Sequence, residues 1–195
     1  MSVDVKVISE LRKISGAPVA DCREALLATN SNMEEAVVYL RKKGLADIKE
    51  RADKSTKEGT IGYYIHTGSK IGVLVEINSE TDFVAKSEDF QNFARELAIH
   101  IAAVNPLYLT KEEVPEDILN REKEIALNGV DKNKPAAILE KIAQGRLQKF
   151  FKEVVLLEQQ FVKDQNLSIQ DLLGTLANKV GEKIVVKRFV RFAVG

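Results

Sequence analysis

The sequence of 195 residues is short of the residue types on which several common classes of protein depend. It contains one cysteine, two histidines and no tryptophan. A single cysteine, Cys22, excludes an intramolecular disulfide framework, and no Cys/His cluster has the spacing of a zinc site. No apolar run is long enough to span a bilayer, and nothing resembles a signal peptide. We therefore expect a cytoplasmic protein with no metal, no cofactor and no membrane partner.

The sequence also lacks an excess of charge of either sign. Its 29 basic residues are balanced by 29 acidic ones. Nucleic-acid binding favours a basic surface with exposed aromatic side chains, and the charged segment 41–58 has no aromatic residue. We therefore expect no nucleic-acid partner, and any partner protein must be recognised by shape.

Groups that could carry catalysis are equally scarce. His100 lies near the apolar stripe of a predicted helix, where a hydrogen-bonded structural histidine is the stronger interpretation, and the role of His66 at a predicted hairpin tip stays open. Cys22 has no nearby histidine to activate its thiol and falls on the buried face of its helix. Glu80 and Asp82 lie in a polar connector, where paired acids usually face water. We predict that the protein is not an enzyme.

Apolar residues at helical spacing divide the first part of the chain into three short helices. The first ends at Gly16, Pro18 opens the second, and Asn32 begins a capping box for the third. Gly44 supplies a C-terminal stop. A core this small, with no disulfide or metal, is marginally stable alone, which favours a docking domain over residues 1–44.

A second domain follows a charged linker over residues 45–58. Alternating apolar residues predict two strands over 61–65 and 71–77, joined as a β-hairpin. A strongly periodic helix comes next, with Ser87 as its N-cap and Asn105 at its end. The core therefore begins with an antiparallel strand pair followed by a long amphipathic helix.

The rest of the chain predicts more helices and one more strand. Two helical stretches, each opened by a proline, form an antiparallel helical hairpin over about 115–160. Ser168 caps another helix, and a last strand runs from Lys183 to Val194. The predicted fold class is α+β, with a core over residues 59–195 in which a three-stranded antiparallel sheet carries its helices on one face.

The polar connector between the second strand and the long helix contains an unexpected aromatic residue. Residues 78–90 read NSETDFVAKSEDF. A turn needs no phenylalanine, so Phe83 either folds back into the core or is held out for a partner.

Two motifs together resemble one family. The run DCREAL at residues 21–26, with Gly16 before it and LRKKG at residues 40–44, is similar to the amino-terminal domain of translation elongation factor Ts. The run TDFVAK at residues 81–86 is similar to the central signature of that family, and the closing RFAVG fits as well. The sequence is identified as a short-form member of this family.

The resemblance implies a fold and a function. Members are guanine-nucleotide exchange factors for elongation factor Tu, with an amino-terminal domain like the ubiquitin-associated fold, a sheet-based core and a protruding helical hairpin. By resemblance, the signature promotes GDP release from GDP-bound elongation factor Tu by intruding near its magnesium site, which assigns partner binding to Thr81, Asp82, Phe83 and Val84. Candidates for amino-terminal docking are Gly16, Asp21 and Arg23.

Two questions stay open at this stage. A three-helix domain of this kind also suits a protein-binding adaptor without exchange activity, although an adaptor has no need of the TDFV signature. Longer members carry a second, related half of the core, so a short form could form a homodimer through its sheet. The last strand has apolar residues on both predicted faces, with Ile184 and Val186 on one and Val185 and Phe189 on the other. Burial beneath the chain's own helices is the alternative.

Overall fold

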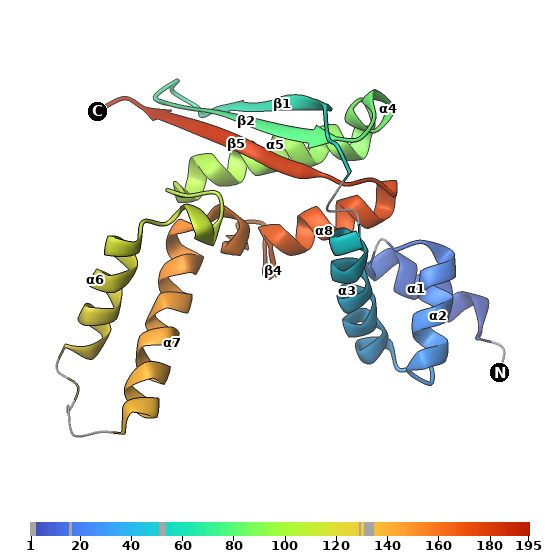
Figure 1. Cartoon of the computed structure of the whole chain (residues 1–195). Coiled ribbons are helices and arrows are strands. Elements are labelled where there is room, and N and C mark those ends of the chain that lie inside the picture. Colours follow the sequence, from blue (N-terminus) through green and yellow to red (C-terminus); the bar gives the residue numbers. More distant parts are fainter. Residues whose placement is uncertain (1–2, 16, 51–53, 129, 131–134) are drawn as a thin grey trace.

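The computed structural model of the chain describes residues 3–15, 17–50, 54–128, 130 and 135–195. Figure 1 shows three parts: a bundle of short helices at the N-terminal end, a core built on a sheet, and a pair of helices that projects from the core. The predicted α+β fold class is confirmed. No helix within these ranges is long and apolar enough to cross a membrane.

The N-terminal bundle consists of three helices: α1 (Val5–Ser15), α2 (Val19–Ala28) and α3 (Met33–Glu50). Their shared core contains the fully buried side chains of Leu11, Cys22 and Leu26. The predicted cap of the third helix is confirmed, because the Asn32 side chain accepts hydrogen bonds from two backbone N–H groups of the first turn. Cys22 is a buried core residue, as expected.

Helix α3 does not end at Gly44, where the sequence predicted a stop. It continues to Glu50 and packs against α8 (Ile169–Val180). A Cβ atom at position 44 would lie 2.1 Å from Nδ2 of Asn178 on α8, so the glycine leaves room for that side chain. The predicted stop was wrong because a glycine can mark a close contact between helices as well as a helix end. A domain boundary at residue 44 would therefore fall inside a continuous helix.

The core is a three-stranded antiparallel sheet in the order β1-β2-β5, formed by β1 (Glu58–Ile65), β2 (Ile71–Ser79) and β5 (Val185–Ala193). Helices α5 (Glu88–Val104) and α8 lie on one side of it (Figure 1). Buried side chains of β2, such as Val75, pack there with Phe90 and Leu97 of α5. The predicted boundaries of α5 are confirmed: Ser87 caps it, and Asn105 ends it in the left-handed conformation.

A β-bulge in β5 changes which side chains face the helices. Glu76 of β2 pairs with Arg188, but the next residue, Ile77, pairs with Val186, so Lys187 is an extra residue in the strand. Val186 and Phe189 both pack with the core under the sheet. The prediction that they lie on opposite faces was wrong, because strict alternation cannot anticipate a bulge.

The other face of the sheet carries a set of exposed apolar side chains, which we call the open face. Strand register aligns Tyr63 of β1 with Leu74 of β2 and Val190 of β5 across this face. The open face comprises large apolar side chains that are all exposed: Ile61, Tyr63, Ile65, Leu74, Val190 and Phe192. Scattered apolar side chains are common on protein surfaces, whereas these lie on one face of three paired strands.

The predicted helical hairpin is present but shorter than expected. Its two helices, α6 (Glu116–Leu127) and α7 (Ala136–Val154), pack together and project from the end of the core opposite the N-terminal bundle (Figure 1). The region after α7 was predicted as helix to about residue 160. It instead forms a short 3-10 helix and a two-stranded sheet: η2 (Leu156–Glu158), β3 (Gln160–Phe161) and β4 (Asp164–Ser168). Another short 3-10 helix, η1 (Lys111–Glu113), precedes α6.

Candidate functional site

The TDFV signature forms a single helical turn, α4 (Asp82–Ala85), between β2 and α5. Thr81 is its N-cap, and its Oγ1 atom accepts a hydrogen bond of 3.3 Å from the backbone N–H of Val84. Ser87 closes the other end, where its hydroxyl donates to the carbonyl oxygen of Val84 at 2.7 Å. Ser79, at the end of β2, donates to the carbonyl oxygen of Thr81 at 2.9 Å. The corner between strand and helix is therefore fixed by hydrogen bonds on both sides.

Consecutive side chains of α4 face opposite environments. Phe83 is 82% exposed, whereas Val84 and Ala85 are each 5% exposed and belong to the main core. The buried pair anchors the turn, and the anchored turn holds the aromatic ring out in solvent. Of the two alternatives that the sequence left for Phe83, the structure has the outward one.

Asp82 lies on the same exposed surface and forms an ion pair with Lys86 one turn later, at 2.7 Å. The hydrogen bond from Lys86 is the main cause that lowers the pKa of Asp82, and the same contact raises the pKa of Lys86. Both side chains are well exposed, so the pair adds little to the stability of the fold. Its effect is to present a carboxylate that stays charged beside the Phe83 ring.

Two of the three predicted amino-terminal docking residues, Asp21 and Arg23, lie in the described part of the chain, on α2. Gly16 lies outside the described residues, and Arg23 is exposed on α2. The carboxylate of Asp21 binds the ammonium group of Lys43 on α3 at 2.9 Å, and Glu24 binds the same ammonium group at 2.5 Å. Asp21 therefore holds α2 and α3 together, and its role in docking stays a prediction.

Exposed apolar residues near the α1–α2 corner were not singled out from the sequence. Ile14 near the end of α1 and Val19 at the start of α2 are both exposed. Both fit the helical spacing of the apolar residues around them, so the sequence predicted them as part of the buried stripes and gave no signal of their exposure.

The two histidines lie in different environments, one buried and one exposed. His100 is fully buried, where its Nε2 atom lies 3.1 Å from Oε1 of Gln159 and its Nδ1 atom accepts a bond of 3.4 Å from the Val162 N–H. Burial lowers the pKa of His100, which keeps it neutral, and the bond to Gln159 opposes this shift. His66 at the hairpin tip contacts the hydroxyl of Tyr64 through Nδ1. Within the described part of the chain, no cluster of His, Cys, Asp and Glu could hold a metal ion.

Comparison with known proteins decides the family. The family model described as elongation factor TS matches residues 6–195. The chain is 50% identical over its full length to elongation factor Ts of Moorella thermoacetica, of which it covers 95%. It is 48% identical to elongation factor Ts of Geobacter sulfurreducens, of which it covers 91%. It is 45% identical to elongation factor Ts of Syntrophus aciditrophicus, of which it covers 98%. Both alignments include the whole of this chain.

The chain belongs to the elongation factor Ts family. It is therefore a translation elongation factor with a role in protein biosynthesis. The alternative of an adaptor with a ubiquitin-associated domain is not favoured, because the relatives match across the core and the hairpin as well as the N-terminal bundle.

The elongation factor Ts fold brings α4 and the N-terminal bundle to the same end of the core, as Figure 1 shows, while the hairpin lies at the other end.

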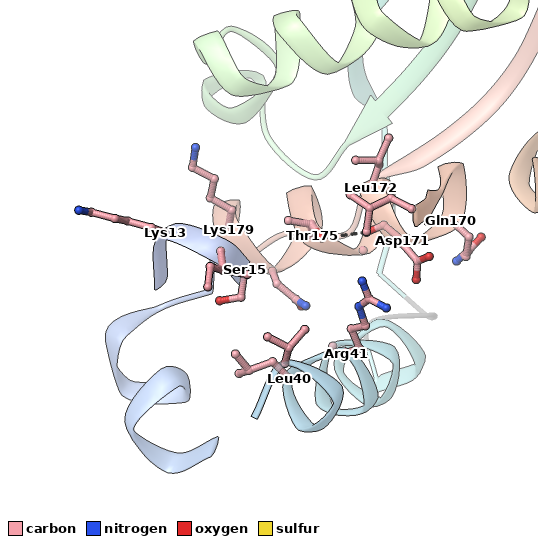
Figure 2. Close-up of a pocket in the computed structure, with 15 residues that line it drawn as sticks. Lys13, Ser15, Leu40, Arg41, Gln170, Asp171, Leu172, Thr175 and Lys179 are labelled. Atoms are coloured by element: carbon pink, nitrogen blue, oxygen red, sulfur yellow. Dashed lines mark hydrogen bonds between the residues drawn. The ribbon is translucent and has the colours of Figure 1, made fainter. Parts of the chain in front are cut away.

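A cavity of about 380 Å³ separates the bundle from α8, with Lys13 and Ser15 on one side and Thr175 on the other. In Figure 2, Arg41 of α3 points across this space toward α8. The bundle thus contacts α8 closely near Gly44 and leaves a gap beside that contact.

Proposed function

We propose that this member of the elongation factor Ts family is a guanine-nucleotide exchange factor that binds GDP-bound elongation factor Tu and promotes the release of GDP. The observation that carries the proposal is the exposed ring of Phe83 on a turn anchored by Val84 and Ala85. An exposed aromatic ring on a fixed turn can be inserted into a partner with little loss of conformational entropy. We assign Thr81, Asp82, Phe83 and Val84 to this site, near the magnesium and phosphate site of the partner: Asp82 and Phe83 face the partner, and Thr81 and Val84 hold the turn that presents them.

An exchange factor of this kind performs no covalent chemistry. It binds the nucleotide-free conformation of its partner better than the nucleotide-bound one, and linkage requires that nucleotide weaken the factor as much as the factor weakens nucleotide. The protein acts through protein–protein binding and is not an enzyme in the usual sense. Its place of action is the cytoplasm, where its partner in translation works.

The energy required exceeds what one aromatic ring supplies. Weakening nucleotide binding on the order of 10⁴-fold needs about 5.5 kcal/mol of coupling. Burying one phenylalanine contributes about 1.5–3 kcal/mol. The remainder comes from displacement of the magnesium ion, whose oxygen shell tolerates little distortion, and from docking of the N-terminal bundle. We assign that docking to the N-terminal bundle, which the sequence bounded at residue 44 and which extends to Glu50 because α3 continues through Gly44.

We further propose that two copies of the chain associate through the open face. The exposed set on that face includes Tyr63, at 71% exposure, and Phe192, at 67%. The open face lies on the side of the sheet opposite α5 and α8, so a second copy can cover it without displacing either helix. Association of identical faces about a two-fold axis is the commonest arrangement of soluble oligomers. Such a homodimer leaves α4 accessible, because α4 lies beyond the end of the sheet (Figure 1).

The test of the exchange function is the rate at which purified elongation factor Tu releases a fluorescent GDP analogue. We expect release to accelerate with increasing concentration of this protein and to approach a plateau. The acceleration should weaken as magnesium is added, since the ion favours the nucleotide-bound partner. Release that is unchanged at saturating concentrations of the protein would rule out the proposed function.

A further inference from the structure

The turn that carries Phe83 is held by a residue from a distant part of the chain. The carboxylate of Glu182 accepts two hydrogen bonds from Thr81, one of 3.0 Å from the backbone N–H and one of 2.6 Å from the hydroxyl. The two residues are 101 positions apart in the sequence. The hydroxyl of Thr81 thus donates to Glu182 while it accepts from the N–H of Val84. The Thr81 hydroxyl is therefore hydrogen-bonded within the chain both as a donor and as an acceptor.

Another hydrogen bond joins the same two segments, with the donor and acceptor segments exchanged. The carboxylate of Glu80 accepts a hydrogen bond of 2.6 Å from the backbone N–H of Lys183. Residues 80–81 and 182–183 therefore contact each other through two residue pairs. Two pairs prevent the relative rotation of the two segments that a single pair would allow. Glu80 also binds the ammonium group of Lys54 at 2.9 Å. We call the contacts among these residues the clamp.

The position of Glu182 follows from how α8 ends. Gly181 caps the helix in the left-handed conformation, with φ of 75°, and its N–H bonds to the carbonyl of Ala177. This conformation is easily reached by glycine and strained for other residues. It turns the chain so that Glu182 and Lys183 face the end of β2 instead of continuing the helix.

A turn as short as α4 depends on contacts of this kind. Its four residues, Asp82–Ala85, are far too few for a helix that is stable by itself. Val84 and Ala85 fix its buried side, but they do not fix the direction of the first residues, which are exposed. The clamp acts on that exposed N-terminal side, directly before Asp82 and Phe83.

We propose that Glu182 is a positioning residue for nucleotide exchange, which holds Thr81 so that the Phe83 ring is presented to the partner in one direction. Glu182 makes no contact with the partner in this proposal and acts only through the α4 turn. The inference rests on the proposed exchange function of Phe83. It also assigns the hydroxyl of Thr81 to holding the turn rather than to touching the partner.

The test is a double-mutant cycle on GDP release from elongation factor Tu. It compares wild type, Glu182→Ala, Phe83→Ala and the double variant in the full chain. Because Glu182→Ala removes two hydrogen bonds to a charged acceptor, we expect release about tenfold slower than with wild type. If Glu182 acts through the ring, the double variant releases GDP no more slowly than Phe83→Ala alone.

A matched control replaces a carboxylate that joins two distant segments elsewhere in the core. Glu96 binds the ammonium group of Lys163 at 2.7 Å, away from the clamp. We expect Glu96→Ala to leave the rate of exchange unchanged. Glu182→Gln serves as a milder variant if Glu182→Ala does not fold, since an amide has one oxygen for the two donors of Thr81. We expect it to slow exchange by less than Glu182→Ala.

The outcomes separate the inference from the function on which it rests. If the effects of Glu182→Ala and Phe83→Ala multiply, Glu182 does not act through Phe83 and the inference is overturned. It is also overturned if folded Glu182→Gln and Glu182→Ala exchange at the wild-type rate while Phe83→Ala is slow. If Phe83→Ala itself exchanges normally, the exchange role of the ring fails first, and the inference fails with it.

Discussion

Phe83 and Val84 are adjacent in the chain, and their side chains point in opposite directions, with Phe83 82% exposed and Val84 5% exposed. This contrast separates the surface that we propose for the partner from a side chain that packs in the core. We expect Phe83→Ala to slow GDP release and to make exchange more sensitive to added magnesium. It should change the free energy of unfolding by about 0.5 kcal/mol or less, as is usual for exposed positions.

Val84→Ala is the matched control for that prediction. Because it removes methyl groups from the core, we expect it to lower the free energy of unfolding by about 1–3 kcal/mol. The folded fraction should still present the Phe83 ring. Thermal unfolding followed by circular dichroism, together with GDP release, measures both effects. A Phe83→Ala variant with a much lower melting temperature and full exchange activity would show that the ring belongs to the fold.

Removal of the N-terminal bundle should weaken binding of elongation factor Tu without unfolding the core. The bundle has its own buried cluster, which includes Leu11 and Leu26, and that cluster is separate from the cluster under the sheet. Because α3 is continuous through Gly44, the deletion should end after Glu50 and not at the predicted boundary. Titration calorimetry measures the binding, and a thermal scan checks the core. Loss of the cooperative thermal transition would mean that the bundle is not a separable domain.

The protein should sediment as a homodimer at micromolar concentration. The expected mass is about twice the 21.7 kDa of one chain, because the open face needs a cover. Tyr63→Glu combined with Leu74→Glu places charges on that face and should give a monomer. Leu107→Glu, at an exposed apolar position outside the sheet, is the control and should leave the mass unchanged. A wild-type mass near that of one chain at every concentration contradicts the proposal.

Acid should destabilise the fold through His100. Burial lowers the pKa of His100 in the folded protein below the ordinary value of 6.5, so the unfolded chain takes up a proton first as the pH falls. Stability from this residue is therefore present above that value and declines below it. Protonation of Nδ1 would also replace an acceptor with a donor opposite the Val162 N–H.

Melting temperatures between about pH 7.5 and about pH 5.5 test this expectation. The slope of melting temperature against pH should be smaller in His100→Gln than in wild type, even though the variant is less stable overall. An unchanged slope in His100→Gln would show that His100 does not contribute.

The sequence correctly predicted the features that depend on residues close together in the chain. The caps at Asn32, Ser87 and Ser168 follow from side chains that bond to backbone groups within three residues, and all three are present. The polar surroundings of Phe83 left two alternatives for its ring, and the burial of Val84 was not predicted. The helix and strand order was readable for the same reason, because each element has its own apolar period.

The features that were missed depend on contacts between distant residues. Gly44 is indistinguishable from a helix stop until Asn178 is placed beside it. The bulge at Lys187 is decided by pairing with β2, and the bond between Glu182 and Thr81 joins residues that no local pattern relates. Sequence reasoning therefore found the exposed residue that we propose for the partner contact but not the residue that we propose to hold it.

The C-terminal end of α8 contacts two parts of the molecule at once. Asn178 in its last turn lies against Gly44 of the N-terminal bundle, and Glu182 just beyond its cap binds Thr81 beside Phe83. An inserted or deleted residue between them would change the separation of the two surfaces assigned to elongation factor Tu. The loop between Ile65 and Ile71 carries no such constraint. Among elongation factor Ts sequences, evolutionary changes in length should therefore be tolerated in that loop and selected against at residues 178–182.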